Sequence, residues 1–589
     1  MSLRSRRMVT VAESVVTALA EHGVTQMWGV VGDALNPVTD AIRTDGRIEW
    51  IGVRHEEAAA FAVSAQAQLT GRIGVCLGTV GPGSIHLLNG LYDAKKSHAP
   101  VLAICGQVPS EEIGSDFFQE VDNDRLFADV AVFARTVSSA AQMPLLLEQA
   151  VNAAYAAHGV AVLTLPGDLG GQELPEGSRT PRFAPGPRFA PGPRWAAAPQ
   201  DQVAKAAQVL SGSETVTLLV GKGAREARAE VLELAQTLQA PMVITLKGKE
   251  GLEHDNPYQV GQSGLIGNSA AAHAMDDADV LFLVGTDFPY RDWYPSGKTV
   301  IQLDARQAHI GRRVAVDHAL VGDVGHTLRA LLPRLSNASD RDSKHLEKAT
   351  RAYASWRDRQ LALVDPDYEK TSLVGKVRGV FDNPDDRIRP EVLAAAVDSL
   401  AAPDAILTSD TGMSTAWLAR FVTLSGTRRL VGSYNLGSMA NAMPQALGAQ
   451  ALDRERQVIS FSGDGGLMML LGDLRTAVTY RLPIKVVVFD NGRLGMVKLE
   501  QEQGGLPEFG TELDNPDIAA VAAALGWHGR RVTNPGDVEE SVRWALETPG
   551  PVLLDVVTNP DEVSVPPEPT LAQGWGFAIA KMKESIESR

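Results

Sequence analysis

The 589-residue chain is poor in cysteine, lacks long apolar runs and has fewer basic than acidic side chains. Its two cysteines, Cys76 and Cys105, lie in apolar, strand-like runs. We therefore expect reduced core thiols and a cytoplasmic protein rather than a disulfide framework. Because no apolar run reaches about 18 residues, we expect no transmembrane segment. The formal net charge of −16 argues against nucleic acid as a partner.

The chain length and two linker-like segments predict about three domains. An apolar content of 44% is ample for that number of cores. Strands and helices alternate along the chain, which predicts α/β domains with parallel sheets. A proline-rich direct repeat and a charged helical stretch separate the domains, since dense proline excludes a helix or a central strand. The predicted ranges are 1–180, a linker at 181–196, 197–342, a helical linker at 343–389, and 390–589.

The most specific motif is a Gly-Asp-Gly turn at Asp464, followed 27 residues later by Asn491. A buried strand precedes each residue and a helix connects the two strands, so both residues reach the ligand-binding edge of a parallel sheet. Their oxygens suit Mg²⁺, and the backbone carbonyl of Arg493 is a third candidate ligand. Gly465 and Gly466 let backbone amides approach a diphosphate. The turn alone is ordinary, and its spacing to Asn491 makes it specific.

A second motif places Glu56 at the start of an alanine-rich segment with a helical composition. An acidic residue at this position can be a surface charge favoured by the helix dipole. The flanking residues are largely apolar, however, and favour burial. A buried carboxyl has a raised pKa and can share a proton with a ring nitrogen. Glu57 is the neighbouring carboxylate that serves as a control.

Together, these motifs resemble those of the thiamin diphosphate (ThDP) enzymes. The resemblance implies that Asp464, Asn491 and Arg493 hold the Mg²⁺ of the bound cofactor. It also implies that Glu56 contacts N1′ of the aminopyrimidine and favours the imino tautomer, which removes the C2 proton of the thiazolium. The implied fold has three Rossmann-like parallel-sheet domains, as in the pyruvate oxidase and acetolactate synthase architecture.

A third segment, residues 432–444, resembles the part of the family that cradles the aminopyrimidine. By that resemblance Gly437 offers a backbone carbonyl to the 4′-amino group, and Ser438 lies in the same cofactor-binding loop. Met439 would be the apolar wedge that bends the cofactor. A methionine in a stretch rich in small residues can equally be core filling. Its position 25 residues before Asp464 favours the wedge.

The middle domain has a Gly-x-Gly turn at residues 221–223, which is a weak nucleotide signal by itself. Further strand-end loops resemble the FAD contacts of pyruvate oxidases, with loop amides at the diphosphate and an acid for ribosyl or adenine groups. The expected FAD-binding residues are Ser263, Gly264, Leu265, Ile266, Gly285, Thr286, Asp287, Phe288, Pro289, Leu303, Asp304 and Asp323. A purely structural Rossmann domain is the alternative.

The resemblance covers about residues 9–583 and is nearest to bacterial pyruvate oxidases of the pyruvate:quinone oxidoreductase type. It implies that Phe118 and Gln119 line the pocket between the thiazolium and the flavin, and that Glu500 is a pocket acid. A core aromatic and a solvated surface charge are the alternatives for Phe118 and Glu500.

Two features depart from that group. Met496 stands where some quinone-reducing members have a phenylalanine thought to move into the site on activation, which puts that step in doubt. The sequence also stops at the short acidic segment 584–589, where some members have a membrane-binding amphipathic tail. Lipid activation by that route is therefore not expected.

The implied reaction is oxidative decarboxylation of pyruvate, or a similar 2-ketoacid, to acetate and CO₂ through hydroxyethyl-ThDP. Electrons pass to FAD and then to a quinone or to oxygen. Glu56 is implied to reach the cofactor held by Asp464 of the partner subunit, so we expect a homodimer or homotetramer with shared active sites. Peripheral contact with the inner face of the membrane is left open.

Two other interpretations remain. An acetolactate synthase-like carboligase would join the same carbanion to a second ketoacid with no net redox chemistry. A non-catalytic ThDP- or nucleotide-binding regulator would need no proton relay, and the joint presence of Glu56, Asp464 and Asn491 argues against it. The sequence does not distinguish quinone from oxygen, or water from phosphate as the acetyl acceptor.

Overall fold

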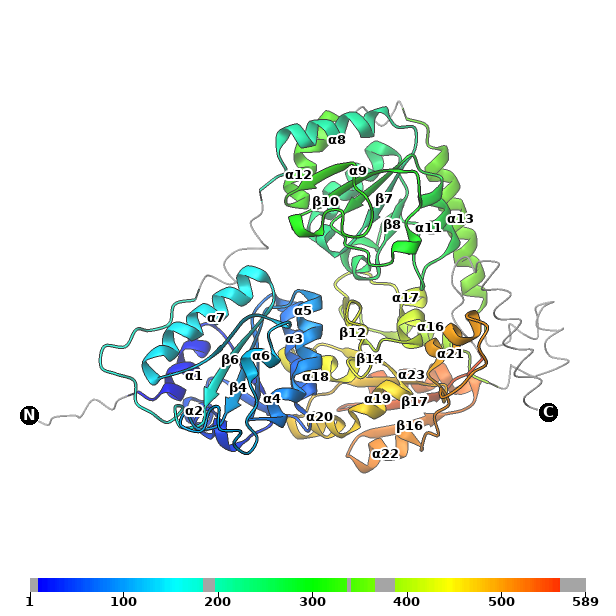
Figure 1. Cartoon of the computed structure of the whole chain (residues 1–589). Helices are drawn as coiled ribbons and strands as arrows, with labels where there is room; N and C mark the ends of the chain where they lie inside the picture. Colours follow the sequence, from blue (N-terminus) through cyan, green and yellow to red (C-terminus); the bar gives the residue numbers. More distant parts are fainter. Residues whose placement is uncertain (1–8, 184–195, 336–340, 366–386, 562–589) are drawn as a thin grey trace, which may run out of the picture.

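The computed structural model describes residues 9–183, 196–335, 341–365 and 387–561. Three parallel β-sheets organise these residues, each covered by helices (Figure 1). The first and third domains lie side by side, and the second lies across them at one end of the molecule. The predicted class, three α/β domains with parallel sheets, is confirmed.

The sheet of the first domain has the strand order β2-β1-β3-β4-β6-β5. Its strands are β1 (Gln26–Gly29), β2 (Glu49–Gly52), β3 (Gly74–Gly78), β4 (Val101–Gln107), β5 (Ala131–Thr136) and β6 (Val160–Pro166). Its helices are α1 (Val11–Glu21), α2 (Asn36–Asp45), α3 (Glu56–Thr70), α4 (Pro82–His86), α5 (Leu88–Ser97), α6 (Asn123–Leu126) and α7 (Met143–Ala157). Cys76 and Cys105 are free thiols buried in β3 and β4, as predicted. Burial raises the pKa of Cys105 to about 12.

The second sheet has the order β11-β10-β9-β7-β8. Its strands are β7 (Val216–Val220), β8 (Met242–Ile244), β9 (Val280–Val284), β10 (Thr299–Asp304) and β11 (His318–Val321). Its helices are α8 (Gln200–Gly212), α9 (Arg228–Leu238), α10 (Lys249–Leu252), α11 (Ser269–Asp276) and α12 (Val324–Leu331). The following helix α13 (Lys344–Ala362) packs on this domain through the buried Ala349.

The third sheet has the order β13-β12-β14-β15-β17-β16. Its strands are β12 (Ile406–Ser409), β13 (Arg429–Gly432), β14 (Val458–Gly463), β15 (Lys485–Asp490), β16 (His528–Val532) and β17 (Val552–Val557). Its helices are α16 (Pro390–Leu400), α17 (Met413–Phe421), α18 (Ala442–Leu452), α19 (Asp464–Met469), α20 (Leu474–Tyr480), α21 (Gly495–Gln503), α22 (Ile518–Ala524) and α23 (Val538–Glu547).

One hydrophobic core is shared by the first and third domains. Its buried side chains come from both domains and include the alanines of α3 and α18. The two helices touch closely, because a Cβ added to Gly448 of α18 would lie 2.2 Å from the carbonyl oxygen of Ala62 in α3. Gln66 Nε2 also donates to Gly448 O at 3.1 Å. Glu56 is therefore held by a helix whose position is fixed by close packing against α18.

Polar contacts join the second domain to the third. Glu250 of α10 accepts from the backbone N of Leu430 at 3.1 Å and pairs with the guanidinium groups of Arg225 and Arg429. Lys249 Nζ lies 2.5 Å from Glu253 Oε1 and 3.0 Å from Ala419 O. The second domain is thus fixed against the third by buried charges that are paired.

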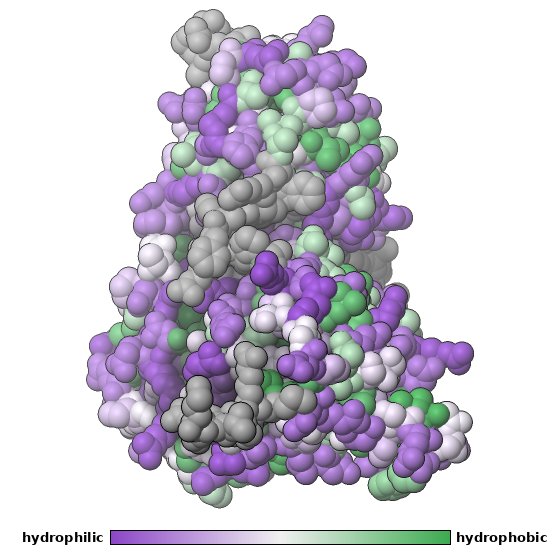
Figure 2. Space-filling model, turned by 90° about the vertical axis from the view of Figure 1, so that its left-hand side faces the viewer, coloured by the Kyte–Doolittle hydropathy of each residue, from purple (hydrophilic) through white to green (hydrophobic). Residues whose placement is uncertain are grey.

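Figure 2 shows the side of the molecule on which the first domain lies nearest the viewer. This side is mainly hydrophilic, with scattered apolar patches. No helix among the described residues has the length and apolar character needed to cross a bilayer. Three predicted segments lie outside the described residues: most of the proline-rich linker (184–195), part of the helical linker (366–386) and the acidic tail (584–589).

Candidate active site

The third sheet brings the two predicted metal ligands to one edge. Strands β14 and β15 pair in parallel, with Gly463 opposite Phe489, so the residues that follow them share the carboxyl edge. The segments that follow β12, β14 and β15 surround an open pocket of about 230 Å³. The lining includes Asp410, Gly412, Gly437, Met439, Asp464, Gly465, Gly466, Asn491, Arg493, Met496 and Glu500. Seven of the C-terminal residues predicted to contact cofactor or metal are therefore around one cavity, together with Glu500.

Asp464 is a deeply buried carboxylate of this lining, with 2% of its surface exposed. Its Oδ2 accepts a hydrogen bond of 2.7 Å from Asn515, which also donates to Asp490 Oδ1 at 2.8 Å. Burial, with the nearby Asp490 carboxylate, raises the pKa of Asp464 to about 7, while the Asn515 amide opposes the rise. A divalent cation would stabilise the charged form at this position.

Asn491 and Arg493 form a tight turn beside Asp464. The backbone N of Arg493 donates to Asn491 Oδ1 at 3.1 Å. The Arg493 guanidinium points away into ion pairs with Glu508 at 2.6 Å and Glu512 at 3.0 Å. Its side-chain charge is thereby neutralised, and the backbone carbonyl remains the group suited to bind a cation, as predicted for this residue.

The predicted wedge segment forms one wall of the pocket. Gly437 has a φ of +80°, which glycine tolerates. Ser438 Oγ accepts from Asn89 of the first domain at 2.9 Å, so this residue faces the domain boundary. Met439 reaches the metal loop (residues 463–466, at the start of α19), because its methyl carbon lies 3.5 Å from where a Cβ on Gly465 would be. A side chain on Gly466 would collide with Asp410, and one on Gly465 would be crowded by Leu513 and Leu494.

Glu56 is buried at the first turn of α3, with 7% exposed, as predicted. Its Oε2 lies 2.9 Å from Nδ1 of His86, whose ring stacks on His55 with centroids 4.3 Å apart. Glu57 instead accepts from Asn89 at 2.7 Å. Within one chain Glu56 is not part of the pocket lining that contains Asp464. The structure therefore does not bring these two predicted groups together in a single subunit.

Phe118 and Gln119 lie on the same side of the first domain as Glu56. Gln119 packs on the loop that precedes α4, since a Cβ on Gly81 would be 2.7 Å from Gln119 O. A Cβ on Gly83, within α4, would in turn be 3.1 Å from Glu56 Oε1. Phe118 is 78% exposed, far more than a core aromatic. This exposure excludes core filling within the chain and leaves the ring available to a partner.

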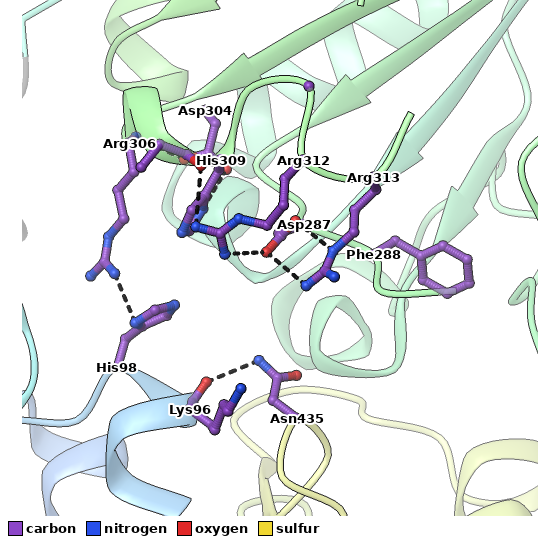
Figure 3. Close-up of polar contacts among 12 residues, drawn as sticks. Lys96, His98, Asp287, Phe288, Asp304, Arg306, His309, Arg312, Arg313 and Asn435 are labelled. Carbon is purple, nitrogen blue, oxygen red and sulfur yellow. Dashed lines mark hydrogen bonds and ion pairs between the residues drawn. The ribbon is translucent and has the colours of Figure 1, made fainter. Parts of the chain in front are cut away.

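Three of the predicted FAD-binding residues, Asp287, Phe288 and Asp304, lie at the carboxyl edge of the second sheet (Figure 3). Asp287 is paired with Arg312 and Arg313, each at 3.0 Å. Asp304 accepts from the backbone N of Arg306 at 2.8 Å and lies 3.2 Å from His309 Nδ1. Both acids thus have protein partners, so neither is a free acceptor in this conformation.

The remaining predicted FAD residues differ in their surroundings. Ser263 is buried and its hydroxyl has no hydrogen-bond partner among the described residues. Gly264 and Gly285 have φ values of +90° and +59°, and Gly285 packs directly on Gly223. Asp323 caps α12 by accepting from the backbone N of His326 at 2.8 Å. Leu265 and Ile266 follow in the same loop as Ser263. Three further residues are buried: Thr286, Phe288 and Leu303. Pro289 directly follows Phe288.

Two lysines that were not predicted as site residues also lie at this edge. Lys222 follows β7 and Lys247 follows β8. Among the described residues, neither ammonium group has a hydrogen-bond or ion-pair partner. Burial, with the Lys222 charge, lowers the pKa of Lys247 to about 7. Burial and the nearby Arg306 also lower the pKa of His98 to about 3. Basic groups thus gather at this edge, where Glu250 and Asp93 are the acids nearest to the two lysines.

Three further residues of the C-terminal and first-domain sites were missed from sequence. Asp410 and Asn515 touch the pocket or its metal ligand, and His86 touches Glu56. Asp410 carried a usable signal, because it follows a buried strand and precedes Gly412 as Asp464 precedes Gly465. Asn515 and His86 carried none, since their contacts cross long stretches of sequence.

Comparisons with known proteins agree with this arrangement. Three family profiles match: Thiamine pyrophosphate enzyme, N-terminal TPP binding domain, at 9–126; central domain, at 203–331; and C-terminal TPP binding domain, at 410–556. A putative thiamine pyrophosphate-containing protein, YdaP, of Bacillus subtilis is 36% identical over 98% of this chain and 97% of its own length.

Two relatives with named activities are similar to the same degree. The pyruvate oxidase of Lactiplantibacillus plantarum is 32% identical over 93% of this chain and 88% of its own length. The acetolactate synthase isozyme 2 large subunit of Escherichia coli is 32% identical over 92% of this chain and 95% of its own length. Identity alone therefore does not choose between oxidation and carboligation.

Proposed function

The chain belongs to the thiamine pyrophosphate enzymes, and on this premise we propose that it is a ThDP- and FAD-dependent oxidase of pyruvate or a similar 2-ketoacid. The observation that carries the ThDP site is that Asp464 and Asn491 line one pocket at the carboxyl edge of the third sheet. The cationic edge of the second domain supports a bound dinucleotide. Acetate and CO₂ are the proposed products.

The residues of the third domain fit Mg²⁺ and a diphosphate. The Asp464 carboxylate, the Asn491 amide oxygen and the Arg493 carbonyl would hold the cation, which prefers oxygen ligands. The amides of Gly465 and Gly466, in the first turn of α19, would bind phosphate oxygens, because glycine allows a close approach to the backbone. When bound, ThDP supplies a carbon nucleophile and an electron sink for decarboxylation.

Glu56 would act on the aminopyrimidine. A carboxyl buried beside His86 at 2.9 Å can hold or release a proton at low cost in reorganisation. Since Glu56 does not line its own chain's pocket, we propose that it completes the pocket of a partner subunit. The exposed apolar side chains Phe118, at 78%, and Phe509, at 84%, support burial in a homodimer or homotetramer.

The second domain fits FAD. Lys222 and Lys247 offer two amino groups that have no partner within the described parts of the chain, and the hydroxyl of buried Ser263, likewise without a partner there, offers a donor in the predicted contact loop. FAD would accept two electrons per ketoacid, and a quinone or oxygen would reoxidise it. Phe118, Gln119 and Glu500 would shape the space for the substrate, with the first two supplied by the partner subunit.

A carboligase of 2-ketoacids is the second candidate, favoured by the similarity to acetolactate synthase. An anaerobic absorbance spectrum of the protein with ThDP and Mg²⁺ decides between the two when pyruvate is added. Bleaching of the flavin band near roughly 450 nm, with acetate formed, supports the oxidase. A flavin that stays oxidised while acetolactate accumulates would replace it with the carboligase.

A further inference from the structure

The backbone is strained where the wedge segment meets α18. Ala440, directly after Met439, has a φ of +66°, in the left-handed region that residues with a Cβ rarely adopt. Ala440 is buried, so solvent does not stabilise this turn. Such a conformation persists only where the surrounding structure holds it in place.

Asp410 provides one part of that support. It follows β12, is 2% exposed, and its Oδ1 accepts a hydrogen bond of 2.9 Å from the backbone N of Ala442, the first residue of α18. The residue before α18, Asn441, does not cap the helix with its side chain, which instead donates to Ser409 O at 3.0 Å. The end of β12 thus caps α18 and holds the chain just after the strained turn.

The other oxygen of Asp410 faces the metal loop. A Cβ on Gly466 would lie 2.5 Å from Asp410 Oδ2, so this carboxylate is in direct contact with the first turn of α19, which follows β14. Oδ2 has no hydrogen-bond partner among the described residues. The Asp410 backbone is itself fixed, since its N donates to Phe461 O of β14 at 3.0 Å.

We propose that Asp410 is a positioning residue that clamps the Met439–Ala440 turn against the metal loop and so sets the wedge before the cofactor binds. This inference rests on the proposed function, because Met439 acts as a wedge only when ThDP fills the pocket. Asp410 would act through Met439 and Gly466 and need not touch the reacting atoms.

Ala440→Gly tests the clamp, because glycine adopts the left-handed conformation of this turn without the conformational strain that alanine incurs. ThDP is titrated in the presence of Mg²⁺ into the full-length wild type, Asp410→Ala, Ala440→Gly and the double variant, with near-ultraviolet circular dichroism as the signal. We expect Asp410→Ala to weaken ThDP binding about tenfold or more. Adding Ala440→Gly to the Asp410→Ala variant should raise its ThDP affinity about fivefold.

The conservative variant Asp410→Asn should lose less affinity than Asp410→Ala, because its amide oxygen can still accept from Ala442. It also keeps the test available if Asp410→Ala does not fold, as judged by thermal denaturation. Ala449→Gly is the matched control, since it makes the same chemical change within α18, where the backbone is helical.

If Ala440→Gly restores ThDP affinity to the Asp410→Ala variant and Ala449→Gly does not, the clamp is supported. Unchanged ThDP affinity in Asp410→Ala, or equal effects of the two glycine substitutions, overturns it. If the wild-type chain itself binds no ThDP, the proposed function fails and the clamp fails with it. Binding by the wild type without restoration in the double variant overturns the clamp alone.

Discussion

The side-chain amide of Asn515 donates a hydrogen bond of 2.7 Å to Asp464, the carboxylate that follows β14. The same amide reaches Asp490 at the end of β15, and Asp490 lies 3.3 Å from Arg531 of β16. The proposed metal ligand is therefore oriented by polar contacts that continue across the sheet edge. Groups that orient a ligand in this way commonly tune metal affinity.

Asn515→Ala should weaken Mg²⁺-dependent ThDP binding by about tenfold or more, because Asp464 loses the contact that orients its carboxylate. A Mg²⁺ titration at fixed ThDP, followed by calorimetry, measures the effect. Asn534→Ala is the control, since Asn534 only caps a short turn away from the pocket. Equal Mg²⁺ affinity in the Asn515 variant and the control would remove Asn515 from the metal site.

Glu56→Gln should lower the rate of CO₂ release from pyruvate by about 10²–10⁴-fold, as expected when a proton-transfer group is lost. Bound FAD should stay at the wild-type level, because Glu56 lies in the first domain. Glu57→Gln is the neighbouring control and should stay within a few-fold of wild type. Full activity in Glu56→Gln would disprove the proton-transfer role.

Mixing two inactive variants tests the shared site. In a dimer of Glu56→Gln with Asp464→Ala, one site would combine both intact residues and the other both lesions. Co-expressed subunits that pair at random should therefore recover about a quarter of wild-type activity. If each subunit used only its own residues, the mixture would stay inactive.

Lys222→Ala with Lys247→Ala should weaken FAD binding by about tenfold or more, because charge-assisted hydrogen bonds to a diphosphate are lost. The flavin-to-protein ratio after gel filtration and a fluorescence titration with FAD give the result. Lys205→Ala, an exposed lysine of α8, should leave both unchanged. Wild-type FAD affinity in the double variant would place the diphosphate elsewhere.

The stability of the cofactor-free protein should depend on Asp410. Burial raises the pKa of Asp410 to about 7, from an unperturbed value of about 3.8. A raised carboxyl pKa gives stability that is full below the unfolded-state pKa and is lost as the pH rises through the folded-state pKa. Asp410→Asn should therefore flatten the fall in the free energy of unfolding between about pH 4 and 7, by up to about 1.4 kcal/mol per pH unit.

Asp40→Asn, a change at an exposed carboxylate, is the control for that pH series. It should leave the wild-type slope in place. If Asp410→Asn also kept the wild-type slope, the Asp410 carboxyl would not be the group that binds the proton on folding.

The sequence predicted the elements that end at the third sheet, because apolar strands and a polar turn are local signals. The apolar run from Pro483 to Phe489 predicts a strand, which is β15, and the run that starts at Val458 predicts β14. Boundaries are less accurate. The run from Gly71 to Leu77 also predicts a strand, but β3 begins at Gly74, because Gly71 ends α3 in a left-handed conformation and the chain needs two further residues to turn.

Contacts between distant segments could not be predicted in the same way. Asn515 lies in a loop without apolar periodicity, 51 residues from Asp464, so no local pattern marks it. The Arg312 and Arg313 partners of Asp287 were missed for the same reason, since only the folded loop after β10 brings them together. The distance of Glu56 from its own chain's pocket is a property of tertiary structure, which spacing along the chain does not encode.

The close contact between α3 and α18 also bears on how the chain is made. Ala62 meets Gly448, so the outer face of α3 stays uncovered until a segment 386 residues later has left the ribosome. At about 5–20 residues per second, that interval lasts roughly 20–80 seconds. The nascent first domain would present an alanine-rich apolar stripe throughout this time, and chaperone dependence during synthesis is the expected cost of the shared core.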